Sequence, residues 1–175
     1  MNDIGQPYLP AAGRKWALPL YDPFVKLTGV DRARKALIEQ ADLRAALRVL
    51  DVGCGTGSLA VAVKRRIPSV DLVCLDPDAD ALAKAARKAG RAGFSVRFDC
   101  GYSQELPYRD ASFDRVFSSF MFHHIRAESR EATLCEIRRV LRSGGSFHML
   151  DFAKPDEQRS SWLTHVGHLS KRLRD

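Results

Sequence analysis

The chain is 175 residues long, with 45% hydrophobic and 28% charged residues, a balance typical of one soluble globular domain and unlike a mainly disordered chain. Its formal net charge of +7 raises the question of a nucleic-acid partner. The basic residues are scattered over helical patterns, so we expect solvated helix faces and no specific nucleic-acid site, with an acidic partner as the alternative. No stretch approaches the roughly 20 uncharged apolar residues of a membrane span.

Residues 1–16 lack the apolar stretch of a secretory signal, so the predicted location is the cytoplasm. The four cysteines are far apart and form no C-x-x-C pair, which argues against a zinc ribbon, a redox motif and a disulfide framework. His165 and His168 are spaced as on one helix face, but no third ligand accompanies them. We therefore expect no metal site.

The first 29 residues are rich in proline, glycine and aromatic residues, a composition that predicts an irregular arm or lid. The rest of the chain, residues 30–175, is expected to form a single domain. It begins with a predicted helix over residues 31–43, for which Asp31 is the expected N-cap.

From residue 48 onward, short apolar runs alternate with helical patterns. Strands are predicted over residues 49–52, 71–76, 95–100, 113–120 and 146–152, and helices over residues 58–67, 78–89, 127–141 and 157–174. This alternation predicts an α/β fold with a doubly wound, mostly parallel, Rossmann-like sheet and helices on both faces.

A glycine-rich loop, residues 53–57 (GCGTG), leaves the first of these strands and opens a helix. Glycines allow a tight turn and the close approach of a ligand to main-chain atoms. The spacing differs from the G-x-G-x-x-G of dinucleotide sites, and Asp51 stands where it would repel a pyrophosphate but attract an ammonium group. Asp76, nineteen residues beyond Gly57 at the end of the next strand, can bind both hydroxyls of a ribose. The combination predicts a nucleoside that carries an amino acid, which is S-adenosylmethionine.

Four segments in this order resemble the motifs of a known family, and they are residues 49–57 (VLDVGCGTG), 106–114 (LPYRDASFD), 122–125 (FHHI) and 136–145 (EIRRVLRSGG). They are similar to the ordered motifs of class I S-adenosylmethionine-dependent methyltransferases, in particular the ubiquinone/menaquinone-biosynthesis-like branch (methyltransferase type 11). The resemblance covers about residues 20–152. It implies a cofactor that lies across the ends of the first four strands, and methyl transfer to a small-molecule acceptor.

Carried onto this sequence, the resemblance assigns Asp51 and the backbone of the glycine loop to the methionine end of the cofactor. Asp76 would hold the ribose hydroxyls, Pro77 would pack near the adenine, and Ser118 would lie by the methionine part. The full set of expected cofactor residues is Asp51, Gly53, Cys54, Gly55, Gly57, Asp76, Pro77, Tyr102, Ser103 and Ser118.

The sequence departs from the family pattern in two places. The family often has an acid that binds the adenine amino group shortly before the Leu-Pro pair, whereas this chain has Tyr102, so we expect main-chain groups around Tyr102 and Ser103, or stacking, to hold the adenine. Family members usually add further strands after the fifth, and here those strands are expected to be missing because residues 157–174 read as a helix. Residues 146–152 would then form an exposed edge, and the chain would form a homodimer through it, aggregate, or be only marginally stable.

His123 and His124 are the candidate catalytic residues. Neighbouring residues of an extended segment point in opposite directions, so the pair does not suit one metal ion. One of the two is the candidate general base for an oxygen or carbon acceptor, and a packing role in the loop is the alternative.

Other classes of function are less consistent with the sequence. Residues 118–121 read SSFM, unlike the Asn/Asp-Pro-Pro-aromatic motif of enzymes that methylate amino groups of bases, and no cysteine follows a proline, as cytosine C5 enzymes require. Asp51 and the glycine spacing disfavour a nicotinamide-dependent oxidoreductase. The rival hypothesis is a non-catalytic S-adenosylmethionine-binding module that needs a partner chain.

Overall fold

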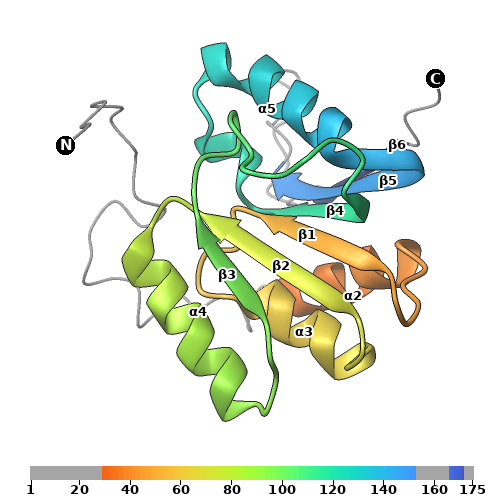
Figure 1. Ribbon diagram of the computed structural model, residues 1–175, viewed down its shortest axis with the longest axis vertical. Helices are drawn as coiled ribbons and strands as arrows, with labels where there is room; N and C mark the ends of the chain where they lie inside the picture. The colour runs from red at the N-terminus through yellow and green to blue at the C-terminus, as the bar shows by residue number, and fades with distance from the viewer. Residues whose placement is uncertain (1–28, 153–165, 172–175) are drawn as a thin grey trace.

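The computed structural model describes residues 29–152 and 166–171, which form one six-stranded sheet of order β3-β2-β1-β4-β5-β6 (Figure 1). The strands are β1 Arg48–Val52, β2 Asp71–Asp76, β3 Arg97–Cys100, β4 Phe113–Ser119, β5 Leu141–Phe152 and β6 Val166–Lys171. The first five are parallel to their neighbours, and β6 is antiparallel to β5. The predicted arm over residues 1–29 lies outside the described residues except for Gly29.

Helices cover both faces of the sheet, as predicted, and they are α2 Val30–Gln40, α3 Ser58–Arg66, α4 Ala79–Arg91 and α5 Ala127–Val140, with a short 3-10 helix η2 at Phe122–His124 (Figure 1). One buried cluster joins Leu37 of α2, Leu59 of α3 and Leu82 of α4 to one face of the sheet. A second cluster joins Ile137 and Val140 of α5 to the opposite face. The predicted doubly wound fold is therefore confirmed.

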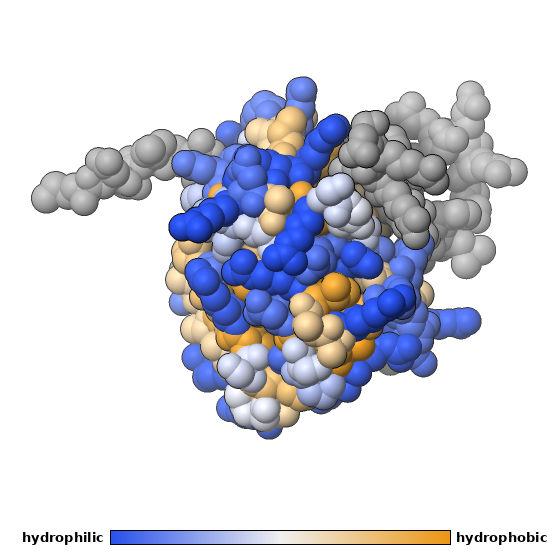
Figure 2. Space-filling view, turned by 45° about the vertical axis from the view of Figure 1, so that its right-hand side comes forward, coloured by the Kyte–Doolittle hydropathy of each residue, from blue (hydrophilic) through white to orange (hydrophobic). Residues whose placement is uncertain are grey.

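The outer surface is mostly polar on the face seen in the space-filling view, where apolar groups show as smaller patches between hydrophilic side chains (Figure 2). No helix in the described ranges, 29–152 and 166–171, has the length and apolar character needed to cross a membrane.

Several helix ends differ from the predicted ones, and two of the differences have a local reason. Gly29, at φ 75°, precedes α2, so Asp31 lies in the first turn, where it pairs with Arg34, and is not the N-cap. The helix predicted to end at Ala89 continues through Gly90 to Arg91. Its chain reverses at Gly93, at φ 77°, because this later glycine adopts the left-handed conformation.

The prediction of an exposed β5 edge is wrong. β6 pairs with β5 in antiparallel register from Phe147↔Lys171 to Phe152↔Val166, and the segment 166–171 that was predicted as helix is a strand. A strand satisfies the outward N–H and C=O groups of β5, which a helix packed on the face of the sheet cannot do. The expectation that the C-terminal strands are missing is corrected for this one antiparallel strand. The homodimer expected through an open β5 edge loses its structural basis. The other part of that predicted helix lies outside the described residues.

Candidate functional site

The glycine loop after β1 has the backbone conformation that its glycines suggest. Gly53, Gly55 and Gly57 all have positive φ, at 70°, 52° and 74°. A Cβ atom at Gly53 would lie 2.1 Å from the Met121 side chain, and one at Gly57 would lie 2.8 Å from Cβ of Ala85. A Cβ at Gly55 meets no atom within 4 Å among the residues that the structure describes. The outer two glycines are therefore needed for packing, whereas the space that a Cβ at Gly55 would occupy is open.

Asp51 is a buried carboxylate without a hydrogen-bond donor. Its residue is 1% exposed, and neither oxygen has a hydrogen-bond partner within the described part of the chain. Burial raises the pKa of Asp51 to about 7, although the positive charge of Arg34 opposes this and the negative charge of Asp76 adds to it. A buried acid in this state favours a cationic group as its ligand.

Asp76 has a structural role that sequence reasoning missed. One carboxylate oxygen accepts a hydrogen bond from the Gly55 N–H at 2.8 Å, and the other accepts one from the Asp78 N–H at 2.9 Å. Burial raises the pKa of Asp76, and these two hydrogen bonds oppose the shift. Asp76 thus ties the glycine loop to the start of α4. Each oxygen keeps a lone pair for a further donor such as a ribose hydroxyl.

Ser118 lies beside Asp51 at the carboxyl end of β4. The register places Asp51 opposite Phe117, so Ser118 is one residue further along the neighbouring strand. Its hydroxyl is fully buried and has no hydrogen-bond partner in residues 29–152. Successive side chains of a strand point to opposite faces, so the Ser118 hydroxyl and the Asp51 carboxylate leave this edge of the sheet on opposite faces. Buried polar atoms are normally paired, so each of the two is a separate candidate contact for a polar ligand.

The remaining predicted cofactor residues line the same edge with different exposure. Cys54 is buried in the core cluster, so its thiol packs as an apolar group. Its backbone N–H donates to the Leu75 carbonyl. Pro77 follows directly after β2, and its carbonyl accepts a weak hydrogen bond from Cys100. Tyr102 is 42% exposed, which leaves its ring available for stacking.

The loop that carries Tyr102 and Ser103 is anchored to α5. The Ser103 hydroxyl hydrogen-bonds to Thr133 at 3.0 Å. Glu136 accepts a hydrogen bond from the Leu106 N–H, and Arg139 donates to the Leu106 carbonyl and to Glu136. The Arg139 guanidinium lowers the pKa of Glu136, so this carboxylate stays ionised. These hydrogen bonds therefore join two of the segments that carry the family resemblance, residues 106–114 and 136–145.

The predicted histidines lie at the carboxyl ends of β4 and β5, where His123 has a partner that sequence reasoning missed. Nδ1 of His123 lies 2.5 Å from a carboxylate oxygen of Asp151, and the other oxygen accepts a hydrogen bond from the His123 N–H at 2.9 Å. The rings of His123 and His124 contact each other with centroids 3.9 Å apart, and burial lowers the pKa of His124. One sequence signal could have pointed to Asp151. It is an acid that directly follows the apolar residues of a strand, as Asp51 and Asp76 are.

Metal chemistry finds no support in the described residues, which contain no group of three His, Cys, Asp or Glu side chains able to hold an ion. Of the two histidines with helical spacing, His165 lies outside those residues, and His168 belongs to the strand β6.

A glycine loop follows the first strand, an acid ends the second, and the first five strands have the order β3-β2-β1-β4-β5. These features define an α/β protein of the doubly wound class, in which ligands are bound at the carboxyl edge of the sheet. More specifically, the chain belongs to the methyltransferase domain family, whose model matches residues 49–145.

Named relatives agree with this assignment. The demethylmenaquinone methyltransferase of Deinococcus radiodurans is 39% identical over 140 residues, which cover 78% of this chain and 57% of that protein. The crystal structure of the YcgJ protein of Bacillus subtilis is 30% identical with a TM-score of 0.66, over 73% of this chain and 53% of that one. The [4+2]-cyclase SpnF is 31% identical with a TM-score of 0.67, over 72% of this chain and 46% of that one. The chain thus spans less than two thirds of the length of these proteins.

Proposed function

We propose that this protein transfers a methyl group from S-adenosylmethionine to a small aromatic acceptor of the quinol type. The observation that carries the proposal is the buried carboxylate of Asp51, which has no hydrogen-bond donor, in the strand that leads to the glycine loop and the open space at Gly55. An amino-acid ammonium group would supply the missing donors and the positive charge. The acceptor class is supported by the Deinococcus relative, which is named for methylation of demethylmenaquinone.

The residues present fit this cofactor. Asp51 would bind the ammonium group, and the Ser118 hydroxyl and the main chain of the glycine loop would hold the rest of the methionine end. Asp76 would take the ribose hydroxyls on its remaining lone pairs, while Pro77 and the exposed ring of Tyr102 would flank the adenine. The bound cofactor supplies an electrophilic methyl group on a sulfonium, so the protein has mainly to align the acceptor and exclude water.

His123 and Asp151 are suited to remove a proton from the acceptor. With Nδ1–H donating to the Asp151 carboxylate, Nε2 of His123 is the nitrogen that can accept a proton. Asp151 would fix this tautomer and stabilise the imidazolium that forms, and deprotonation would make the quinol a better nucleophile toward the methyl group. His124 contacts the His123 ring and restricts its orientation.

Turnover to S-adenosylhomocysteine with a panel of phenols and reduced quinones tests the proposal. We expect product with a reduced quinone, tight cofactor binding in calorimetry, and loss of both in Asp51→Ala. Cofactor binding without turnover on any acceptor would favour the rival, a non-catalytic binding module, and absence of cofactor binding would contradict both. The fold alone does not require methyl transfer, because a solved protein of similar fold and 31% identity is a [4+2]-cyclase. The cytoplasmic location expected from the sequence stays a prediction.

A further inference from the structure

The positive charge of the molecule is concentrated on one helical layer. Helices α2, α3 and α4 contain ten Lys or Arg against three Asp or Glu, a net charge of +7, which equals the formal charge of the whole chain. Helix α5, on the opposite face of the sheet, has three of each and no net charge. The basic residues are scattered along the sequence, but ten of the 28 lie on these three helices with few acids among them.

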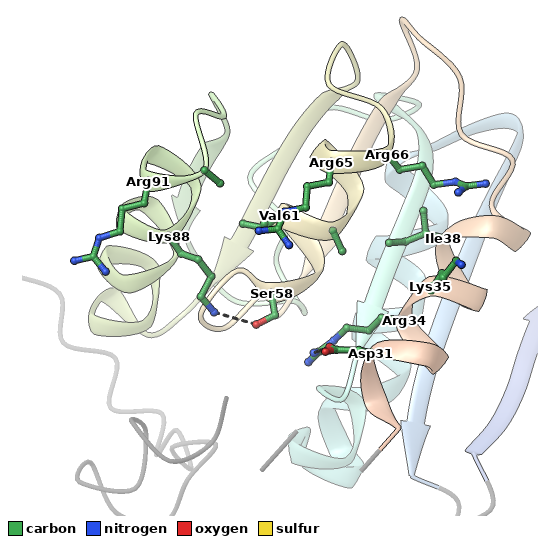
Figure 3. A pocket seen from close by; sticks show the side chains of 12 residues that line it. Asp31, Arg34, Lys35, Ile38, Ser58, Val61, Arg65, Arg66, Lys88 and Arg91 are labelled. Carbon is green, nitrogen blue, oxygen red and sulfur yellow. Dashed lines mark hydrogen bonds and ion pairs between the residues drawn. The ribbon is translucent and has the colours of Figure 1, made fainter. Parts of the chain in front are cut away.

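A groove of about 750 Å³ lies between the three helices (Figure 3). Six basic side chains line it, and they are Arg34, Lys35, Arg65, Arg66, Lys88 and Arg91, with Asp31 as the one acidic lining residue. Ile38 and Val61 give the groove an apolar floor. We call this surface the basic groove.

Several of these charges are not compensated within the fold. Arg34 pairs with Asp31 at 3.5 Å and Arg66 with Glu39 at 3.8 Å. Lys35, Arg65 and Arg91 are exposed and have no hydrogen bond or ion pair with any residue that the structure describes. Like charges held together on one surface repel each other, and an anionic partner relieves that repulsion.

The groove lies next to the candidate site. Its lining residue Ser58 begins α3 directly after the glycine loop. Arg34, at its other side, acts electrostatically on Asp51 and places its guanidinium 5.8 Å from the Phe120 ring, at the carboxyl end of β4. A surface that binds the basic groove would therefore meet the molecule beside the place where the acceptor is expected.

We infer that the basic groove and the surrounding α2–α3–α4 face dock the protein on the surface of an anionic lipid bilayer. The inference rests on the proposed function, since an apolar quinone is concentrated in the bilayer. Lys and Arg side chains near an anionic membrane are attracted by its negative surface potential. Apolar residues below a rim of long basic side chains also suit the lipid interface, where such side chains reach toward the headgroups.

Nucleic acid is the less favoured anion. Proteins that hold single strands without sequence preference combine basic side chains with aromatic rings on which bases stack. The groove lining contains no aromatic residue and no histidine. The cations of the groove can therefore attract an anion, but the groove offers no ring on which a base could stack.

Vesicle co-sedimentation of the full chain tests the inference. The probes are phosphatidylcholine vesicles with and without phosphatidylglycerol, at about 0.1 M salt, where the Debye length is about 10 Å. The variant is Arg65→Glu/Arg91→Glu, and the matched control is Arg109→Glu/Arg138→Glu, which changes the net charge equally through two exposed residues outside the basic layer. We expect binding only to the anionic vesicles, a loss of at least about tenfold in the Arg65/Arg91 variant, and a much smaller change in the control.

Three results would overturn the inference: no binding of the unchanged protein to anionic vesicles, equal losses in the two double variants, or tighter binding to DNA that anionic vesicles do not displace. Methylation of a short-chain, water-soluble quinol is measured on the same samples. If that reaction fails while vesicle binding follows the basic groove, the proposed function is wrong and the docking surface stands. If it proceeds equally in all variants while vesicles are not bound, the proposed function stands and the docking surface is wrong.

Discussion

Burial of an ionised Asp51 costs the folded chain stability, because its two oxygens have left water without gaining a donor in the described structure. The pKa of this carboxyl is raised from 3.8 to about 7. The pKa of Asp51 is higher in the folded chain than in the unfolded chain, so protonation of Asp51 stabilises the fold. This contribution is fully present below about pH 4 and is lost as the pH rises through about 7. The same side chain must be ionised to bind an ammonium group, so stability and binding make opposite demands on it.

Asp51→Asn should therefore stabilise the ligand-free protein while it removes cofactor binding. At about pH 8 we expect a gain of roughly 1 kcal/mol or more, a rise in Tm of about 2–4 °C, because the neutral amide avoids the buried charge. At about pH 4 the two proteins should unfold at similar temperatures, since Asp51 is then protonated. Thermal unfolding at both pH values checks this, and an Asn variant that is less stable at pH 8 would contradict it.

Cofactor binding by the unchanged protein should weaken in acid. Below pH 7 the fraction of Asp51 that is ionised falls about tenfold per pH unit, and affinity should fall with it. Calorimetric titration between about pH 5 and pH 8 measures the effect. A constant affinity over this range would show that the Asp51 charge does not contact the ligand.

The contact between His123 and Asp151 predicts that a change at either residue affects the rate of methyl transfer and not the affinity for the cofactor. Asp151→Asn should leave cofactor affinity unchanged and lower kcat, because the amide neither fixes the imidazole tautomer nor stabilises the imidazolium. His123→Ala should lower kcat about a hundredfold or more. Steady-state kinetics with a reduced quinone measures both variants, and an unchanged kcat in Asp151→Asn would contradict this role.

At the scale of elements, the sequence predicts what is determined locally. The run of strands and helices from residue 48 to residue 152 follows from alternating apolar patterns, and the glycine loop follows from five consecutive residues. Helix ends were less exact, since Gly90 is tolerated inside α4 and the chain turns at Gly93. The partner of His123 was missed because Asp151 is 28 residues away and meets it only when β5 lies beside β4.

Strand β6 was missed for a related reason. An antiparallel return strand is selected by the unpaired edge of β5, and that edge exists only once the parallel sheet has formed. The apolar spacing of residues 157–174 fitted a helix, and local periodicity carries no information about an edge elsewhere in the fold.

This pairing predicts that β6 shields β5. Amides of residues 147–152 whose N–H groups face β6 should exchange slowly in the full chain. A chain that ends at residue 165 should lose this protection and self-associate more, because it exposes the β5 edge. Hydrogen exchange and light scattering on both chains measure these effects. Equal exchange and equal mass would contradict the pairing.

At the scale of the whole molecule, the sheet separates two electrostatic environments. The α2–α3–α4 layer carries the net charge of the chain, whereas α5 is neutral and its charges form ion pairs such as Arg139–Glu136. Self-repulsion within a charged layer opposes folding, and it is strongest when salt is low. The same layer therefore lowers the stability of the free protein and favours an anionic partner.

Salt should accordingly stabilise the free protein. The Debye length falls from about 30 Å at 0.01 M to about 8 Å at 0.15 M, which screens repulsion across the basic groove. We expect Tm to rise over this range, and the rise should shrink in Arg65→Glu/Arg91→Glu because that variant removes two repelling cations and adds two anions. Arg109→Glu/Arg138→Glu has the same net charge but leaves the basic groove intact, so it should keep most of the salt dependence. Equal salt dependence in the two variants would mean that total charge, and not its concentration on one layer, determines the stability of this fold.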